Sequence, residues 1–121
     1  MADELTDEQV QQLVSDLRAL QLELGAALEQ SREGVKPVEL DQPIGRLSRM
    51  DAIQQQNMLA ATRRNTELRV RKIRAALAAA ERGEYGNCVE CEEPIGFRRL
   101  RARPESRLCL HCQRALEQPS R

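Results

Sequence analysis

Aromatic residues are nearly absent from this chain of 121 residues, which has no Trp, one Tyr and one Phe. A chain so poor in rings cannot fill a broad globular core with them. Leu and Ala supply most of the apolar content, and Glu, Gln and Arg are abundant. This composition favours long helices and is compatible with a coiled coil. The length predicts one domain by default.

Long apolar runs are also lacking. No stretch approaches the roughly 20 residues that a membrane-spanning helix needs. The N-terminus reads Met-Ala-Asp-Glu-Leu, which is acidic and has no apolar stretch of a secretory signal peptide. We therefore expect a cytoplasmic protein without a membrane partner, in a reducing compartment.

The chain as a whole has no excess of acidic or of basic residues, because its formal net charge is zero. The distribution is uneven. Residues 1–41 carry ten acids and three bases (net −7), residues 42–82 nine bases and three acids (net +6), and residues 83–121 seven bases and six acids (net +1). This pattern predicts an acidic segment lying beside a basic one. Bulk nucleic-acid binding usually goes with a basic whole, so direct DNA binding is not expected.

A first helix is predicted to begin after Thr6 and to end near Gly34. Thr6 and Gln9 match the capping-box pattern that starts helices. Apolar residues then recur at steps of three and four, which is typical of a heptad seam. They are Val10, Leu13, Leu17, Leu20, Leu24 and Ala27.

A second helix is predicted from Arg46 to about Arg82, because this stretch contains no Pro or Gly. Two prolines and two glycines precede it and predict a tip loop at about residues 34–46. Its C-terminal half carries a narrow apolar seam that includes Val70, Ile73 and Leu77, whereas its N-terminal half does not. A loop this short favours antiparallel neighbours, so we expect a coiled-coil hairpin. The alternative is an ordinary amphipathic helix on a compact bundle.

The four cysteines fall into two pairs, Cys88-Val-Glu-Cys91 and Cys109-Leu-His-Cys112. Two residues between thiols let both sulfurs face one ion, and two such pairs complete a tetrahedron. The pattern predicts one structural Zn²⁺, because four thiolates leave no open coordination position. Disulfides or redox dithiols are the alternative, which the lack of a secretory signal disfavours. His111 lies within the second pair but is not needed as a ligand.

Arginines are dense between the two pairs, at positions 98, 99, 101, 103 and 107. They predict either an anion-binding surface or a solvated ribbon that pairs internally with Glu90, Glu92 and Glu93. We expect a small hairpin or an irregular ribbon in this region, and a short helix from about Leu110 to Gln118. Glu92 follows the first pair at a position where many zinc knuckles use Gly, which predicts strain if its φ is positive.

These residues together resemble the C-terminal zinc finger of the DksA/TraR family. The resemblance lies in Gly83-Glu-Tyr-Gly-Asn-Cys88, Ile95-Gly-Phe-Arg-Arg-Leu100, Ala102-Arg-Pro104 and Cys109-Leu-His-Cys112-Gln113. It implies a bacterial transcription factor that binds RNA polymerase without binding DNA. Family members push the tip of a helical hairpin through the secondary channel of the enzyme, and longer members also bind the alarmone ppGpp.

The resemblance also implies site residues at the tip and at the alarmone interface. Family tips carry Asp-x-x-Asp-x-Ala, and an ungapped count from Cys88 puts these positions on Gly45, Ser48 and Met50. The nearest acids are Asp41 and Asp51, and Asp51-Ala52 retains an Asp-Ala pair in a shifted register. The same count places two basic alarmone positions on Lys72 and Arg103, and a third on Gln113.

The sequence thus predicts a mainly α protein with a helical coiled-coil hairpin over residues 1–82. A small four-cysteine zinc finger with a short terminal helix follows over residues 83–121. No catalytic constellation is present, so we do not expect an enzyme; we expect a monomeric regulator of RNA polymerase, with ppGpp as a further ligand. The alternatives are a zinc ribbon that binds nucleic acid through its arginines and a thiol-based redox or zinc sensor.

Overall fold

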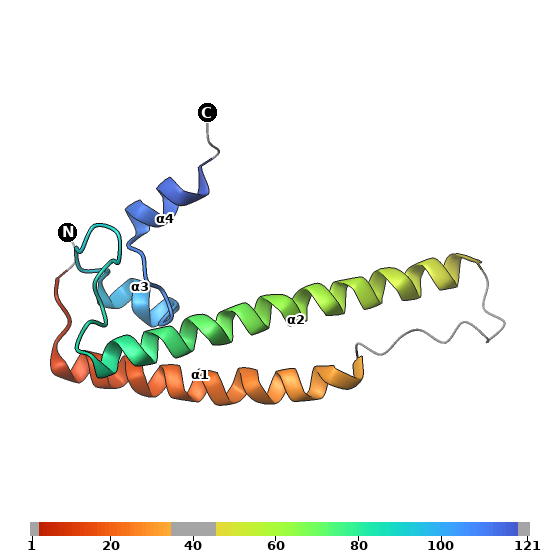
Figure 1. Cartoon of the computed structure of the whole chain (residues 1–121), viewed down its shortest axis with the longest axis horizontal. Helices are drawn as coiled ribbons and strands as arrows, with labels where there is room; N and C mark the ends of the chain where they lie inside the picture. Colours follow the sequence, from red (N-terminus) through yellow and green to blue (C-terminus); the bar gives the residue numbers. More distant parts are fainter. Residues whose placement is uncertain (1–2, 35–45, 119–121) are drawn as a thin grey trace. The chain divides into compact units, whose positions relative to one another are not determined.

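The computed structural model describes residues 3–34 and 46–118, which form four helices (Figure 1). The helices are α1 (Asp7–Gly34), α2 (Arg46–Glu81), α3 (Phe97–Ala102) and α4 (Leu110–Glu117). The described residues contain no strand, and one isolated bridge joins Asn87 and Pro94. The mainly helical class is therefore confirmed. The predicted Asp41 lies outside the described residues.

The chain divides into two compact units. The first consists of Met1–Gln21 and Arg71–Arg121, and the second of Leu22–Val70. Within each unit a stretch of α1 lies beside a stretch of α2 that runs in the opposite direction (Figure 1). The predicted helical hairpin is thereby confirmed. The predicted division of the chain at residue 82 stays a prediction.

The start of α1 is fixed by the capping box that the sequence contains. The backbone N–H of Gln9 donates to Thr6 Oγ1 at 3.1 Å, and the backbone N–H of Thr6 donates to Gln9 Oε1 at 3.0 Å. These two bonds satisfy donors that would otherwise have no partner in the first turn. Asp7 and Glu8 follow in that turn, where the helix dipole favours acids.

The apolar seam is buried most completely in the first unit. Leu13 and Leu17 of α1 are fully buried, as are Ile73, Ala76 and Ala79 of α2. The predicted seam position Ala27 was wrong, because Ala27 is exposed and Leu28 is half-buried instead. A helix with 3.6 residues per turn drifts from a strict heptad, so the fourth residue after Leu24 faces α2 and the third does not.

The end of α2 is set by Gly83. This residue adopts φ 72°, a left-handed conformation that glycine takes without steric cost. The N–H of Gly83 donates to the Ala80 carbonyl at 3.1 Å, and the N–H of Glu84 donates to the Ala79 carbonyl at 2.8 Å. This pair of bonds is the Schellman arrangement, and it caps carbonyls that the helix leaves open.

Between the two cysteine pairs the structure has a helix where a hairpin or ribbon was expected. α3 begins after Gly96, which has φ 101°, and it ends before Pro104. Leu100 of α3 is fully buried, and it packs in the core that also contains Leu13, Cys88 and Ile95. The helix escaped sequence analysis because six residues with one buried side chain give no measurable periodicity.

Candidate metal centre

The first cysteine pair lies in a turn whose two arms are joined by backbone hydrogen bonds. The N–H of Cys88 donates to the Glu93 carbonyl at 2.8 Å, and the N–H of Glu92 donates to the Cys88 carbonyl at 2.9 Å. Beyond the turn, the N–H of Ile95 donates to the Gly86 carbonyl at 2.9 Å. These bonds hold the Cys88 and Cys91 side chains on one side of the turn.

Glu92 adopts φ 64°, so the sequence-based concern about this position was justified. It is the one residue other than glycine with a positive φ among those that the structure describes. A side chain in the left-handed region costs roughly 1–2 kcal/mol. The knuckle therefore stores strain that the surrounding hydrogen bonds, and a bound ion, have to offset.

The second cysteine pair lies at the start of α4. Cys109 is the N-cap residue of this helix, and its Sγ accepts a hydrogen bond from the backbone N–H of Cys112 at 3.4 Å. The N–H of Gln113 donates to the Cys109 carbonyl at 2.9 Å. The first turn of α4 thus directs both thiols of the pair to the same side, and its N–H groups favour negative sulfur.

The four thiols converge on one point. All four Sγ atoms lie within 4.8 Å of one another, and the Sγ atoms of Cys91 and Cys109 are 3.7 Å apart. A tetrahedron with Zn–S bonds of about 2.3 Å has edges of about 3.8 Å. The donor set and its spacing therefore fit one Zn²⁺. All four cysteines are free of disulfide bonds, and His111 is exposed outside the cluster.

The electrostatics of the cluster also call for a cation. Burial opposes ionisation of Cys88, but hydrogen bonds from the backbone N–H groups of Cys91, Cys109 and Glu90 outweigh it and lower the pKa of Cys88 to about 6. Hydrogen bonding to Cys109 and burial raise the pKa of Cys112 to about 12. The Cys88 thiol therefore loses its proton readily, whereas the Cys112 thiol keeps its proton. Binding of Zn²⁺ removes this conflict, because the ion stabilises four thiolates together.

The finger is attached to the helices through a small apolar core. Cys88 is 2% exposed and packs with Leu13, Ile95 and Leu100. Leu5, which precedes α1, reaches the same core, and a Cβ added at Gly86 would lie 2.8 Å from its Cδ1 atom. The backbone of the first knuckle and the start of α1 are thus in direct contact. Sequence analysis did not single out Leu5, although its place before an N-cap residue is a recognised staple position.

The predicted arginine surface is partly used for structure. Arg99 Nε donates to the Leu108 carbonyl at 3.0 Å, and Arg107 Nη1 donates to the Ala75 carbonyl at 3.3 Å. The guanidinium of Arg101 lies 6.0 Å from the centre of the Phe97 ring. Among the described residues no ion pair joins these arginines to Glu90, Glu92 or Glu93. The internal pairing considered above is therefore absent from this part of the chain.

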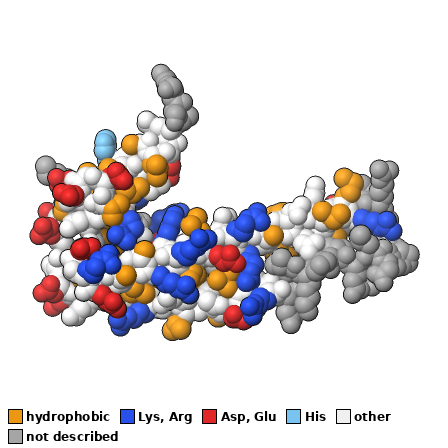
Figure 2. Space-filling model, viewed as in Figure 1, with side chains coloured by type: hydrophobic (Ala, Val, Ile, Leu, Met, Phe, Trp, Pro, Cys, Tyr) orange, Lys and Arg blue, Asp and Glu red, His pale blue; other side chains and the backbone are white. Residues whose placement is uncertain are grey.

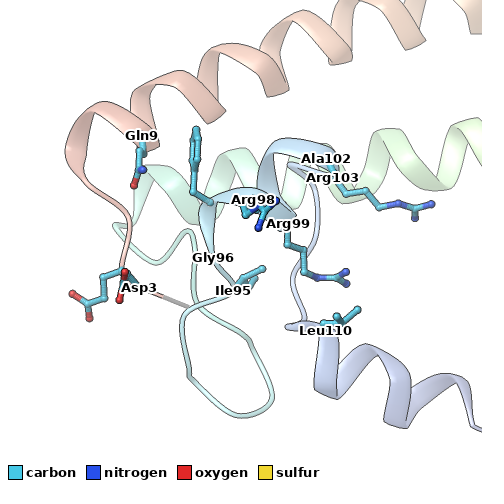
Figure 3. Close-up of a pocket in the computed structure, with 11 residues that line it drawn as sticks. Asp3, Gln9, Ile95, Gly96, Arg98, Arg99, Ala102, Arg103 and Leu110 are labelled. Atoms are coloured by element: carbon cyan, nitrogen blue, oxygen red, sulfur yellow. The ribbon is translucent and has the colours of Figure 1, made fainter. Parts of the chain in front are cut away.

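A pocket of about 690 Å³ lies beside α3 (Figure 3). Arg98, Arg99 and Arg103 contribute to one part of its lining, and Asp3 and Glu4 come from the segment before α1. Part of the lining is apolar, and it consists of Ile95, Phe97, Ala102 and Leu110. Arg103, one of the two predicted anion-binding residues, therefore faces a mixed acidic and basic pocket.

The other predicted site residues lie on α2. Lys72 is exposed and does not line the pocket. Asp51 is an exposed residue of the second helical turn, and Ala52 beside it is half-buried. The structure therefore does not gather Lys72 and Arg103 into one pocket, and their common role stays a prediction.

A polar contact between Tyr85 and the finger was not anticipated. The Tyr85 hydroxyl donates to the Pro104 carbonyl at 2.9 Å. Burial raises the pKa of Tyr85, and the negative charges of Glu105 and Asp16 raise it further. Glu105 is itself buried. The sequence shows only that Tyr85 is the single Tyr and that it follows Gly83 at the end of α2. This does not reveal that its partner is Pro104, 19 residues away.

Known proteins with similar sequences share the finger. Residues 83–118 match the family of prokaryotic dksA/traR C4-type zinc fingers. The RNA polymerase-binding transcription factor DksA of Haemophilus influenzae is 42% identical over 48 residues, which are 40% of this chain and 33% of that protein. The corresponding protein of Caulobacter vibrioides is 41% identical over 68 residues, covering 50% of this chain and 48% of its own. The chain thus spans about a third to a half of these relatives.

The similarity to solved structures extends over the helices. Transcription factor DksA2 from Pseudomonas aeruginosa superposes with a TM-score of 0.73 and 28% identity, covering 92% of this chain and 84% of its own. DnaK suppressor protein from Agrobacterium tumefaciens gives a TM-score of 0.57 over 88% of this chain. The fold and the four-thiol site define a helical protein with a structural zinc finger. Residues 83–118 are a C4-type zinc finger of the dksA/traR kind, and the fold of the chain is similar to that of DksA2.

Proposed function

We propose that this protein binds RNA polymerase and regulates transcription through the secondary channel of the enzyme, without contacting DNA. The observation that carries the proposal is the similarity to DksA2 over 92% of the chain, which includes both long helices and the finger. The curated relatives that match the finger are named as RNA polymerase-binding transcription factors. The protein would act as a cytoplasmic monomer.

The proposal assigns a different role to each part of the chain. Cys88, Cys91, Cys109 and Cys112 hold one structural Zn²⁺, which keeps α3 and α4 in place. The zinc-bearing part sits at the entrance of the channel, and the connection between α1 and α2 leads into it. Asp51 and Ala52 lie in the second turn of α2, and Asp41 precedes that helix in the sequence. The action is electrostatic or steric, and no chemical step is assigned to the protein.

Arginines and lysine on the first unit are the proposed contacts to anions. Lys72 and Arg103 match the charge type of two family positions for ppGpp, so the alarmone is a candidate ligand in the complex with polymerase. A third position is Gln113, which carries no charge. We therefore expect a weaker response to ppGpp than in family members that have three basic groups.

The experiment that tests the proposal is binding of the purified full-length protein to immobilised core RNA polymerase, with zinc content measured in parallel. We expect retention at micromolar concentration or below, and no retention on double-stranded DNA or single-stranded RNA at physiological salt. Strong, salt-dependent retention on nucleic acid alone would favour the zinc-ribbon alternative. Loss of zinc and formation of disulfides under mild oxidation, with no polymerase binding, would favour the thiol sensor.

No helix among the described residues is both long enough and apolar enough to span a bilayer.

A further inference from the structure

The segment before α1 contains one apolar residue, Leu5, between polar neighbours. Leu5 is half-buried, whereas Asp3, Glu4 and Thr6 are exposed. The capping box at Thr6 fixes the direction in which the chain enters α1, and a residue before an N-cap usually packs on the fourth helical residue, here Val10. Leu5 also packs against the core of the zinc finger. This segment is therefore joined to the finger through a single apolar side chain.

Leu5 contacts the backbone of the finger at Gly86. Gly86 is buried and has φ 104°, and a Cβ atom added there would lie 2.8 Å from Leu5 Cδ1 and 3.4 Å from Leu5 Cγ. The Gly86 carbonyl accepts the hydrogen bond from the N–H of Ile95 at 2.9 Å. Gly86 thus belongs to one arm of the turn that presents Cys88, and Leu5 lies directly against that arm.

The cysteines of the first pair differ in their exposure. Cys91 is exposed, whereas Cys88 is 2% exposed and packs in the core with Leu13. A chelator can reach Cys91 in the folded protein, but complete release of an ion requires Cys88 to leave the core as well. That step is a local opening of the finger. An apolar side chain that covers the core makes this opening less favourable, because the opening exposes that side chain to water.

We propose that Leu5 is a positioning residue for the zinc site, and that it slows the release of Zn²⁺ by holding the first knuckle closed through Gly86 and Cys88. Coupled equilibria are reciprocal, so loading the finger with Zn²⁺ should also stabilise the first turn of α1. A partner that displaced residues 3–6 would make the zinc labile. None of these contacts involves polymerase, so this role of Leu5 and the proposed function can fail separately.

Attraction between charges is the other way in which this segment could be held. Figure 2 shows acidic side chains at the end of the first unit where α1 begins. Asp3 and Glu4 line the same pocket as Arg98 and Arg103 (Figure 3). Among the described residues, however, no ion pair joins these acids to these arginines, and both acids are exposed. Exposed charges contribute little to such a contact, so the geometry favours Leu5.

The test is the rate at which the zinc-loaded, full-length protein transfers its Zn²⁺ to a chromogenic chelator under native conditions. Leu5→Ala should accelerate the transfer about tenfold, because it removes most of the apolar contact. Leu5→Met keeps the contact and should stay within about twofold of the unchanged protein. A rate for Leu5→Ala equal to that of the unchanged protein would overturn the proposal.

Two controls separate this role from general stability and from charge. Leu17 is fully buried in α1 but is not part of the finger core, so Leu17→Ala should lower the free energy of unfolding and leave the transfer rate within about twofold. The double variant Asp3→Asn, Glu4→Gln should also transfer zinc at the unchanged rate. If either control accelerates the transfer as much as Leu5→Ala does, the proposal is wrong.

Two glycines test the contact itself. Gly83→Ala and Gly86→Ala both place a side chain at a positive φ, but a Cβ atom at Gly83 would meet nothing within 4 Å. In the Leu5→Ala protein the acceleration caused by Gly86→Ala should fall about threefold or more, whereas the effect of Gly83→Ala should not change. Additive effects at both glycines would show that Leu5 does not act through Gly86.

Hydrogen exchange gives a readout that does not depend on zinc transfer. The backbone N–H groups of Gln9 and Val10 donate to Thr6 in the first turn of α1. In the unchanged protein their exchange should be slower with Zn²⁺ than without it, and this difference should shrink in Leu5→Ala. Equal protection of these two amides in the zinc-loaded and zinc-free proteins would overturn the coupling between α1 and the metal site.

Discussion

The two units of this protein use their apolar residues in opposite ways. Among the described residues, the first unit contains all the buried hydrophobic side chains except Val70, including Leu13, Ile73 and Leu100. The second unit contains most of the strongly exposed ones, namely Leu22, Met50, Ile53, Met58, Leu59 and Leu68. The first unit therefore has the means to hold itself together, and the second has surface available for a partner.

The difference follows from what lies against the helices. In the first unit the finger adds α3 and its own apolar core to the paired helices, and a bound Zn²⁺ closes both knuckles. In the second unit the residues that the structure describes belong to α1 and α2 alone. Two helices alone bury one stripe each, so other apolar positions remain exposed. Stability and binding are thus allocated to different stretches of the same two helices.

The largest expected effect is loss of the metal. Cys109→Ser, or treatment with a strong chelator, should abolish stoichiometric zinc and unfold the finger, because the free energy of binding of a structural zinc, on the order of 10 kcal/mol, is also folding energy. Metal analysis and hydrogen exchange over residues 83–118 measure this. The two long helices should keep much of their circular dichroism signal. A Cys109→Ser protein with full zinc occupancy would remove this cysteine from the ligand set.

Truncation of a leucine should destabilise the first unit strongly and the second unit hardly at all. Leu13→Ala removes a fully buried side chain and is expected to lower the free energy of unfolding by about 2–5 kcal/mol. Leu22→Ala removes a side chain of the same type from the same helix, but one that is exposed, and should change the free energy by less than about 0.5 kcal/mol. Urea denaturation followed by circular dichroism gives both values. Equal losses would abolish the contrast between the units.

The helices were predictable because their ends carry local signals. Thr6 and Gln9 cap α1, Gly83 terminates α2, and the predicted bounds of both helices agree with the structure within about a residue. The cysteine spacing likewise predicted a cluster of four thiols. The helix ends depend on residues close together in sequence, so short-range physical chemistry is sufficient for them. The thiol cluster joins two distant pairs, and it was predictable because one tetrahedral ion needs both pairs.

The features that escaped prediction depend on residues far apart in the chain. Arg63 contacts Leu28 and Ser31 over more than 30 positions, and Leu5 packs against Gly86. No local pattern encodes such pairs, because they arise only when the helices pair in one particular register. α3 was missed for a different reason, since a single buried side chain, Leu100, positions it.

A smaller change should stabilise the first unit. Glu92→Gly removes a side chain from a residue with φ 64° and should raise stability by about 1 kcal/mol. The matched control is Glu93→Gly, which removes the same charge from the neighbouring residue, where φ is not positive, and should lower stability by about 0.5–1 kcal/mol. Thermal unfolding of the zinc-loaded proteins distinguishes the two. Destabilisation by Glu92→Gly would mean that its carboxylate contributes more than its backbone costs.

The smallest effect on folding, and the most informative one for function, is expected from Asp51→Asn. Asp51 is exposed and is the single acid in residues 49–62 of α2, so its loss should leave zinc content, unfolding and polymerase binding intact. A carboxylate held near catalytic metal ions in a confined channel interacts strongly, because screening there is poor. The variant should therefore lose any effect on transcription in vitro, whereas Glu29→Gln, an exposed acid of α1, should keep it. If Asp51→Asn regulates like the unchanged protein, the acid is not the effector, and the protein acts by occupying the channel or at another place.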